Sequence, residues 1–366
     1  MTREQSTSAR DTWIEVDLKS ILRNYQNIKS KTDPAKVYAV IKANAYGHGI
    51  LEVATWLEKG ACDGFCVALV EEGLLLREHG IRTPIIVLNG IYGKTHQTVI
   101  DYELTPVVYR MDDAQCFDLL SQQKTKIHLK VDTGMARLGV RAEELETFIE
   151  KLKTLKNLQV EGLMTHMSSP WTDTRETERQ IASFIKCKAL LRKHGYEPSL
   201  CHVANSETLL KYNNSHFDLV RPGISLYGIG DGLHPAMRLV SSIVSIRTVP
   251  KGSAVGYNQS FVTNTSSRIA TIGIGYGDGV PRRLSNRGQV LIQGKRCPIV
   301  GAVSMDLLNV DLSSCPEASI GDEVVIFGQQ KDAFLGVEEV AQLADTIPYE
   351  ILVQLLSRVP RMYKIS

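Results

Sequence analysis

The sequence of 366 residues predicts an α/β protein, a (β/α)8 barrel of the TIM type followed by a mostly β C-terminal domain. Short β-branched runs alternate with longer amphipathic stretches through the first two thirds of the chain, which is typical of βα units around a parallel sheet. There are eight such runs, as many as a closed barrel has strands. After about residue 238 the pattern changes to strands separated by Gly, Asn and Lys turns, which indicates a second, mostly β domain.

The eight barrel strands are expected in short apolar runs. These are residues 36–42, 64–69, 84–88, 105–109, 126–132, 160–166, 199–204 and 217–223. Between them, apolar residues recur at helical spacing, for example in 50–60 and 143–155. Periodicity alone does not close a barrel, so a doubly wound open sheet also fits this pattern.

The β domain is expected to contain strands within 238–249, 267–277, 289–301, 307–312 and 322–328, and helices at 337–345 and 349–357. The predicted division is therefore a barrel over 1–238 and a β domain over 239–366. Residues 13–17 form a short strand before the first barrel strand and could pair with either domain.

Composition excludes several classes of partner. The 42 Lys and Arg nearly balance 40 Asp and Glu, so no broad basic face for nucleic acid is expected. No run approaches the roughly 20 apolar residues of a membrane span, and the first residues lack the apolar core of a secretion signal. The seven cysteines are odd in number and scattered, and Cys62 and Cys66 lack the further ligands of a metal site. We expect a cytoplasmic protein with reduced cysteines and no metal.

Polar residues gather where the predicted barrel strands end. These are Lys42, Lys130 with Arg137, His166, Asn205 with Ser206, and Arg221 with Gly223. Barrel enzymes place their chemistry at the carboxyl ends of the strands. The residue types suggest a bound polar cofactor or substrate that is anionic.

Each of these residues also has a structural interpretation. Lys42 could be a surface lysine, although the turn of small residues after it lets the backbone approach a ligand closely. His166 could be a hydrogen-bonded core histidine, and Arg221 could pair with Asp218. The glycine-rich stretch around Tyr276 could be a β-turn in which the tyrosine only packs.

Eight motifs, in this order and spacing, resemble the bacterial alanine racemase family between Trp13 and Arg361. They are VYAVIKANAYGHG, LKVDTGMARLG, THMSSP, VANSET, VRPGISLYG, IGYGDG, PIVGAVSMD and TIPYEILVQLLSRVPR. The resemblance implies a barrel that binds pyridoxal 5'-phosphate, followed by a β domain. One stretch, residues 167–173 after His166, departs from the small, acidic sequence expected in that family.

The resemblance also implies roles for individual residues. Lys42 would hold the cofactor covalently and act as one acid/base group, and Tyr276 would act as the second. Arg221 would face the pyridine nitrogen, Arg137 the phenolic oxygen and the substrate carboxylate, and His166 the back of the ring. The remaining cofactor-binding positions are Tyr46, Asn205, Ser206, Gly223, Ile224 and Tyr349. Met305 and Asp306 would contact the substrate.

Lys130 matches a family position that is often carbamylated, where the resulting anion would hold Arg137. The alternative is an ordinary lysine paired with Asp132. The family resemblance further implies a homodimer with shared active sites, in which Tyr276 and Met305 act across the interface.

The expected activity is the interconversion of L-alanine and D-alanine, which supplies D-alanine for peptidoglycan. A racemase that prefers serine is one alternative, because an apolar pocket discriminates weakly against one added hydroxyl. A decarboxylase of the same fold would have a His-x-Gly-Ser motif and a late cysteine and aspartate pair, which Cys315-Pro316-Glu317 does not match. A non-catalytic carrier of pyridoxal phosphate would end after the barrel.

Overall fold

The computed structural model describes residues 10–365, which fall into two compact units. One unit comprises residues 21–45 and 50–234, and the other comprises the remaining described residues, 10–20, 46–49 and 235–365. Residues 1–9, with which the predicted barrel domain begins, lie outside the described residues.

The first unit is a nearly closed barrel of parallel strands in the order β10-β2-β3-β4-β5-β6-β8-β9, with the short β7 beside β6. The strands are β2 (Lys36–Val40), β3 (Gly64–Val67), β4 (Ile85–Val87), β5 (Thr105–Val108), β6 (Thr125–Asp132), β7 (Val140–Arg141), β8 (Leu158–Met164), β9 (Leu200–His202) and β10 (Leu219–Val220). The N–H groups of Asp218 and Arg221 donate to the carbonyls of Cys201 and Ala204, which links the last strand to the first. The predicted barrel is confirmed, and the open sheet is not.

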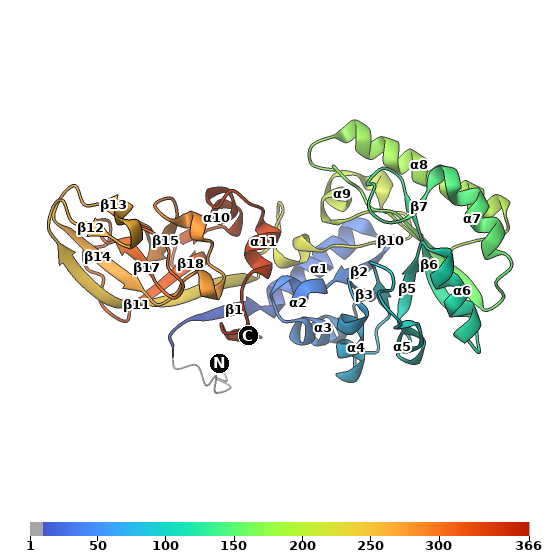
Figure 1. Ribbon diagram of the computed structural model, residues 1–366, viewed down its shortest axis with the longest axis horizontal. Coiled ribbons are helices and arrows are strands. Elements are labelled where there is room, and N and C mark those ends of the chain that lie inside the picture. Colours follow the sequence, from blue (N-terminus) through green and yellow to red (C-terminus); the bar gives the residue numbers. More distant parts are fainter. Residues whose placement is uncertain (1–9, 366) are drawn as a thin grey trace. The chain divides into compact units, whose positions relative to one another are not determined.

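Helices lie along the outside of this sheet, as Figure 1 shows for α3 to α8. They are α1 (Leu18–Thr32), α3 (Ile50–Lys59), α4 (Val70–Glu78), α5 (His96–Asp101), α6 (Met111–Leu120), α7 (Leu145–Leu152), α8 (Thr174–Lys193) and α9 (Ser206–Lys211), with 3-10 turns at Ala142–Glu144, Asn213–Ser215 and Ile224–Tyr227. Helix α3 buries Val53, Ala54 and Leu57. Their helical spacing places them on one face, which packs toward the core.

The second unit is built around a twisted antiparallel sheet in the order β16-β15-β18-β11-β1-β20. The long strand β11 (Met237–Val249) also pairs with β14, so it joins two parts of the sheet. Strand β1 (Trp13–Asp17) pairs antiparallel with β11 and parallel with β20 (Arg361–Lys364). The other elements are β12 (Ala254–Val255), β13 (Phe261–Val262), β14 (Ser267–Ile272), β15 (Gln289–Ile292), β16 (Lys295–Pro298), β17 (Leu308–Asp311), β18 (Glu323–Gln330), β19 (Ala333–Leu335), α10 (Val337–Leu343) and α11 (Pro348–Val353), with 3-10 turns at Tyr257–Gln259, Tyr276–Asp278 and Arg282–Leu284. The predicted mostly β architecture is confirmed.

The last two expectations concern the cysteines and the membrane. All seven cysteines are free, and only Cys116 is exposed. Within residues 10–365 no helix is both long and apolar enough to cross a membrane.

Candidate active site

Lys42 begins a turn, labelled α2 (Lys42–Tyr46), whose backbone is left-handed. Residues 43–46 have φ angles between 52° and 55°, a conformation that costs about 1–2 kcal/mol for each residue with a Cβ. Two hydrogen bonds hold it. Glu72 accepts the N–H of Ala43 at 2.6 Å, and the Asn44 amide oxygen accepts the first N–H of helix α3 at 2.8 Å. The predicted turn of small residues is thus held by specific hydrogen bonds. The first barrel strand ends at Val40, before Lys42.

The barrel unit brings four cations together. The pKa of Lys42 is lowered by burial and by the charge of Arg137. The pKa of Lys130 is lowered to about 8 by burial and by the charges of Arg221 and Arg137, which the opposite effect of Asp132 offsets only in part. Within the described part of the chain, none of Lys42, Lys130 and Arg137 forms an ion pair. The Asp132 carboxylate instead accepts the N–H groups of residues 134 and 135 at 2.9 Å each. Such a cluster favours an anionic ligand.

Arg221 is 3% exposed and lies at the end of β10. Its guanidinium donates to His202 Nδ1 and to the carbonyls of Thr165 (2.8 Å) and Val203 (3.2 Å). The predicted alternative of a pair with Asp218 is wrong, because the Asp218 carboxylate instead accepts the N–H of Cys201 at 2.8 Å and lies 3.9 Å from Lys188 Nζ. Burial lowers the pKa of Arg221 to about 10, so the guanidinium remains charged at neutral pH and only donates hydrogen bonds.

Two buried histidines, His202 and His128, continue the hydrogen bonding that begins at Arg221. Since Arg221 has only donors, His202 Nδ1 must accept, and the proton of that ring lies on Nε2. His202 Nε2 is 2.7 Å from His128 Nδ1, so His128 carries its own proton on Nε2, which is 3.7 Å from the Glu161 carboxylate. Both rings are 0% exposed. This series of donors fixes the tautomer of each histidine and holds Arg221 in place.

These histidines make stability depend on pH. Burial, followed by the charge of Arg221, lowers the pKa of His202 well below its ordinary value, and burial also lowers the pKa of His128. The unfolded chain therefore binds protons that the folded chain excludes once the pH falls below about 6.5. The pKa of a third histidine, His166, is also lowered well below its ordinary value. With three such groups, we expect the free energy of unfolding to fall by about 4 kcal/mol between about pH 7.5 and about pH 5.5, measured by urea denaturation.

The dependence on pH has a matched control. His128→Asn removes one of the three groups, so it should reduce the slope of the unfolding free energy against pH by about a third. His79 is exposed, and His79→Gln should leave the slope unchanged. A wild-type unfolding free energy that stays constant over this pH range would contradict the assignment of these histidines as neutral in the folded protein.

His166 follows β8 and stays neutral. Burial and the charges of Arg221 and Lys130 lower its pKa well below the ordinary value. A neutral imidazole can lie against an aromatic ring system without adding charge to a site that already contains four cations.

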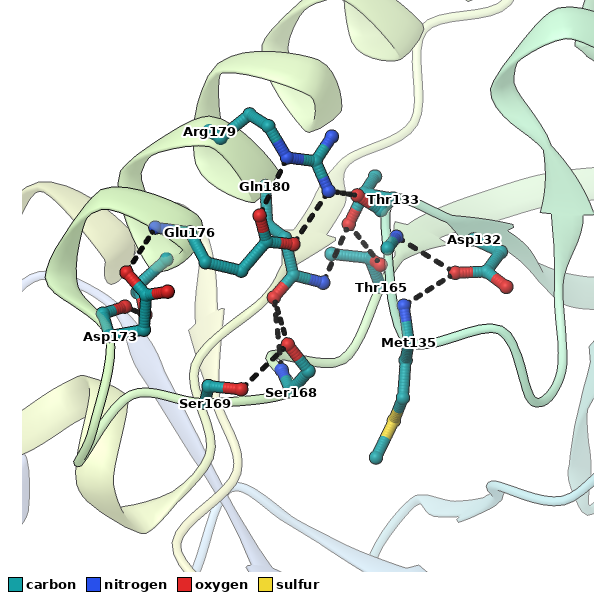
Figure 2. A network of polar contacts seen from close by, with 12 residues as sticks. Asp132, Thr133, Met135, Thr165, Ser168, Ser169, Asp173, Glu176, Arg179 and Gln180 are labelled. Carbon is teal, nitrogen blue, oxygen red and sulfur yellow. Dashed lines mark hydrogen bonds and ion pairs between the residues drawn. The ribbon is translucent and has the colours of Figure 1, made fainter.

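The unusual loop after His166 is tied to the neighbouring strand by helix α8, as Figure 2 shows. The side chain of Gln180 is 0% exposed. Its carbonyl accepts the N–H and the hydroxyl of Ser168 at 2.9 and 3.0 Å, and its amide donates to the His166 carbonyl at 3.3 Å and to Thr133 Oγ1 at 3.4 Å. Thr133 Oγ1 is also 2.9 Å from Thr165 Oγ1. The ends of β6 and β8 are therefore held together despite the departure of this loop from the family sequence.

Ser206 lies beside the backbone of Gly223 in the barrel unit. Its hydroxyl accepts the N–H groups of Gly223 (2.8 Å) and Ser225 (3.2 Å). The N–H of the buried Ile224 donates no hydrogen bond to any described residue, so it is available to a ligand. Asn205 caps helix α9 by accepting the N–H of Thr208 at 3.1 Å. These donors suit a phosphate or another small anion.

The second unit contains the other predicted site residues in two groups. The rings of Tyr46 and Tyr349 lie 5.9 Å apart. Tyr276 is close to the segment of Met305 and Asp306, because its N–H donates to the carbonyl of Ser304 at 3.0 Å. Tyr276 is 40% exposed and Met305 54% exposed.

Sequence reasoning missed residues that support these groups. Glu72 holds the left-handed turn, His202 and His128 hold Arg221, and Gln180 holds the loop after His166. One signal was available for the histidines, since each has apolar neighbours within a predicted barrel strand. Gly162 leaves the space that the His128 ring occupies, because a Cβ at position 162 would lie 2.3 Å from His128 Nδ1.

The fold is that of a barrel enzyme with a second, mostly β domain, and the cluster of cations in the barrel unit suits an anionic ligand. The family models of the alanine racemase N-terminal domain and C-terminal domain match residues 16–231 and 236–363. The chain belongs to the alanine racemase family.

Individual relatives agree over the full length. The alanine racemase of Halothermothrix orenii is 38% identical over 370 residues, which cover 97% of each chain. The crystal structure of alanine racemase from Streptomyces lavendulae, a producer of D-cycloserine, matches with a TM-score of 0.94 at 31% identity and covers 99% of this chain and 98% of that one. The alanine racemase of Bartonella henselae with covalently bound pyridoxal phosphate matches with a TM-score of 0.89 at 31% identity, over 98% and 100% of the two chains.

Proposed function

We propose that this chain is a pyridoxal 5'-phosphate-dependent isomerase that interconverts L-alanine and D-alanine with two acid/base groups, Lys42 and Tyr276. The observation that supports this most strongly is the cluster of Lys42, Lys130 and Arg137, none of which has an ion-pair partner in the described part of the chain, around the charged Arg221. An anionic cofactor that reacts with an amine and a substrate with a carboxylate would together complete this site.

The residues of the barrel fit pyridoxal 5'-phosphate. The hydroxyl of Ser206 and the N–H of Ile224 would hold its phosphate beside the backbone of Gly223, with Tyr46 and Tyr349 as further hydrogen-bonding groups. Lys42 supplies the amine that holds the cofactor covalently. When bound, the cofactor supplies an electrophilic carbon and a conjugated ring that takes up negative charge from the α-carbon of the substrate.

Racemisation requires that a proton leaves one face of the α-carbon and that another arrives on the opposite face. Lys42 Nζ would serve one face and the Tyr276 hydroxyl the other. The pKa of Lys42 is below its usual value because of burial and Arg137, which increases the fraction of neutral amine that can accept a proton at neutral pH. Arg137 would bind the substrate carboxylate, and Met305 and Asp306 would line its other side.

Arg221 has a distinct role in this mechanism. Three of its five N–H donors have acceptors in the barrel, so donors remain for the ring nitrogen. A guanidinium cannot accept a proton at neutral pH, so it leaves this nitrogen unprotonated. Charge is then withdrawn less strongly into the ring, which favours a rapid return of the proton to the α-carbon over side reactions such as transamination.

We also propose that Lys130 is carbamylated. The Nζ lone pair would form a bond with the carbon of CO2, one C–O π bond would become a carboxylate oxygen, and the amine would release a proton. The pKa of about 8 leaves a substantial neutral fraction near neutral pH, and the anion formed would pair with Arg137.

A mass measurement tests this modification. In bicarbonate at about pH 8, we expect the native protein to gain the mass of one carbon dioxide, and Lys130→Arg to gain none. Lowering the pH should remove the adduct, because protonation of Nζ releases CO2. A native wild-type protein with no such adduct would show that Lys130 is an ordinary lysine.

The active enzyme is proposed to be a homodimer with shared sites in the cytoplasm, where its free thiols remain reduced, and its D-alanine would serve peptidoglycan synthesis. Purified protein with L-alanine should form D-alanine, resolved by chiral chromatography. Release of CO2 without D-alanine would instead support the decarboxylase. The same assay with L-serine measures the preference between the two substrates.

A further inference from the structure

A cluster of four charged residues lies directly beside Tyr276 in the second unit. The carboxylate of Asp278 has 0% side-chain exposure. Arg10 donates to both of its oxygens at 2.6 and 3.1 Å, and Arg358 Nε donates to one of them at 2.7 Å. The N–H of Gly275 donates to the other oxygen at 3.0 Å. Asp278 thus links the residues on either side of Tyr276, because its carboxylate accepts the N–H of Gly275 and its own N–H donates to the Gly275 carbonyl at 3.0 Å.

Arg358 connects this group to a second segment. Its Nη2 donates to the Asp306 carboxylate at 2.8 Å and lies 3.5 Å from the carbonyl of Met305. One planar guanidinium therefore bridges two carboxylates on different segments, 275–279 and 304–306. The fork of Arg suits such a bridge, and the compact ammonium of Lys does not.

The two segments are in contact without spare room. The N–H of Gly277 donates to the carbonyl of Met305 at 2.8 Å. A Cβ on Gly275 would lie 2.3 Å from the carbonyl oxygen of Ser304, and a Cβ on Gly277 would lie 2.7 Å from Arg358 Nη2. Position 275 therefore requires glycine, and a side chain at position 277 would displace the Arg358 guanidinium. A shift of either segment thus moves the other.

The charges in the cluster balance, with two carboxylates and two guanidinium groups. Burial alone would raise the pKa of Asp278, but hydrogen bonds from Arg10, the Gly275 N–H and Arg358 outweigh burial, so the pKa lies below its ordinary value. Removing Arg358 leaves Asp306 without this ion-pair partner and leaves Asp278 with Arg10 as its one charged partner among residues 10–365. The bridge between the segments is then lost, although Asp278 stays ionised.

We infer that Arg358 is a positioning residue for the proposed racemisation: by bridging Asp278 and Asp306, it fixes Tyr276 and Met305 in one arrangement. This inference rests on the proposed role of Tyr276 as the second acid/base group. It also gives the Asp306 carboxylate a partner within its own chain.

The test uses Arg358→Met, which keeps the length of the side chain and removes the bridge. We expect kcat/KM for alanine to fall about 10- to 100-fold, since a displacement of about 1 Å of a reacting group has effects of this size. The fall must be the same for both enantiomers, because the equilibrium constant between them is fixed at unity. The kinetic isotope effect on kcat/KM should rise for one α-deuterated enantiomer only, the one whose α-proton Tyr276 removes.

Two further variants complete the design. Arg358→Lys retains a charge but not the fork, so it should show the same one-sided isotope effect with a smaller loss of activity, and it decides the matter if Arg358→Met does not fold. Arg296→Met removes a surface ion pair with Glu339 in the same unit and should leave the activity and both isotope effects unchanged.

A purely structural role would reduce activity only in proportion to the folded fraction and would leave both isotope effects unchanged. That result, or unchanged activity in Arg358→Met, would overturn the inference. The proposed function fails separately, if the wild-type protein does not racemise alanine. If Tyr276→Phe shows the one-sided isotope effect and the folded Arg358 variants do not, only the role of Arg358 is rejected.

Discussion

Lys42→Ala is expected to reduce kcat/KM for racemisation of L-alanine by at least about 10³, because it removes both the covalent attachment of the cofactor and one acid/base group. Activity is measured by chiral chromatography with saturating pyridoxal 5'-phosphate. Addition of a small primary amine should restore part of the activity, since it can replace the missing base but not its position.

Lys36→Ala provides the matched control. Lys36 is exposed at the opposite end of the same strand, β2, and its loss should leave activity unchanged. Reduction of the holoenzyme with borohydride, followed by peptide mapping, should place the cofactor label on Lys42. A label on any other lysine would reject the assignment of this residue.

Tyr276→Phe is expected to lower kcat/KM about 10²- to 10⁴-fold, the usual contribution of one general acid/base group. The phenyl ring keeps the packing of this segment and lacks only the hydroxyl. Tyr257→Phe is the control, because Tyr257 is 69% exposed in the same unit and has no role in the proposed mechanism. An activity of Tyr276→Phe close to wild type would exclude Tyr276 as the second base.

Mixing the two inactive variants tests whether sites are shared between subunits. After dissociation and reassociation of Lys42→Ala with Tyr276→Phe, about half of the dimers should be heterodimers, each with one intact site, which gives about a quarter of the wild-type activity. Native mass spectrometry must show that heterodimers formed. Heterodimers without activity would mean that Lys42 and Tyr276 of one chain serve the same site.

The barrel could be predicted from sequence because its strands are short runs of buried, mostly apolar residues, such as Val37 to Val40 in β2. The positions of Lys42, His166 and Arg221 followed from the same pattern, since the ends of parallel strands lie at one edge. The positions of Tyr276 and Met305 did not follow from a pattern. They came from a family resemblance, and their roles remain proposals.

What could not be predicted depends on contacts between residues far apart in the sequence. Ala43 and Asn44 have no intrinsic preference for a left-handed turn sufficient to reveal it, and the carboxylate of Glu72 that holds the turn is 29 residues away. Asp218 is closer to Arg221 in sequence than His202 is, which favoured the wrong partner. Arg358 and Asp278 are separated by 80 residues, and no local pattern marks them as a pair.

The central claim is that two groups on opposite faces of the α-carbon exchange its proton. Racemisation of L-alanine in deuterated water, followed from the first turnovers by mass spectrometry of each enantiomer, tests it most directly. We expect D-alanine that has deuterium from solvent at the α-carbon from the earliest times, with no transfer of the proton of the substrate to the product. Early D-alanine that retains the α-proton of the substrate would contradict it, because a single base would then have carried the proton from one face to the other.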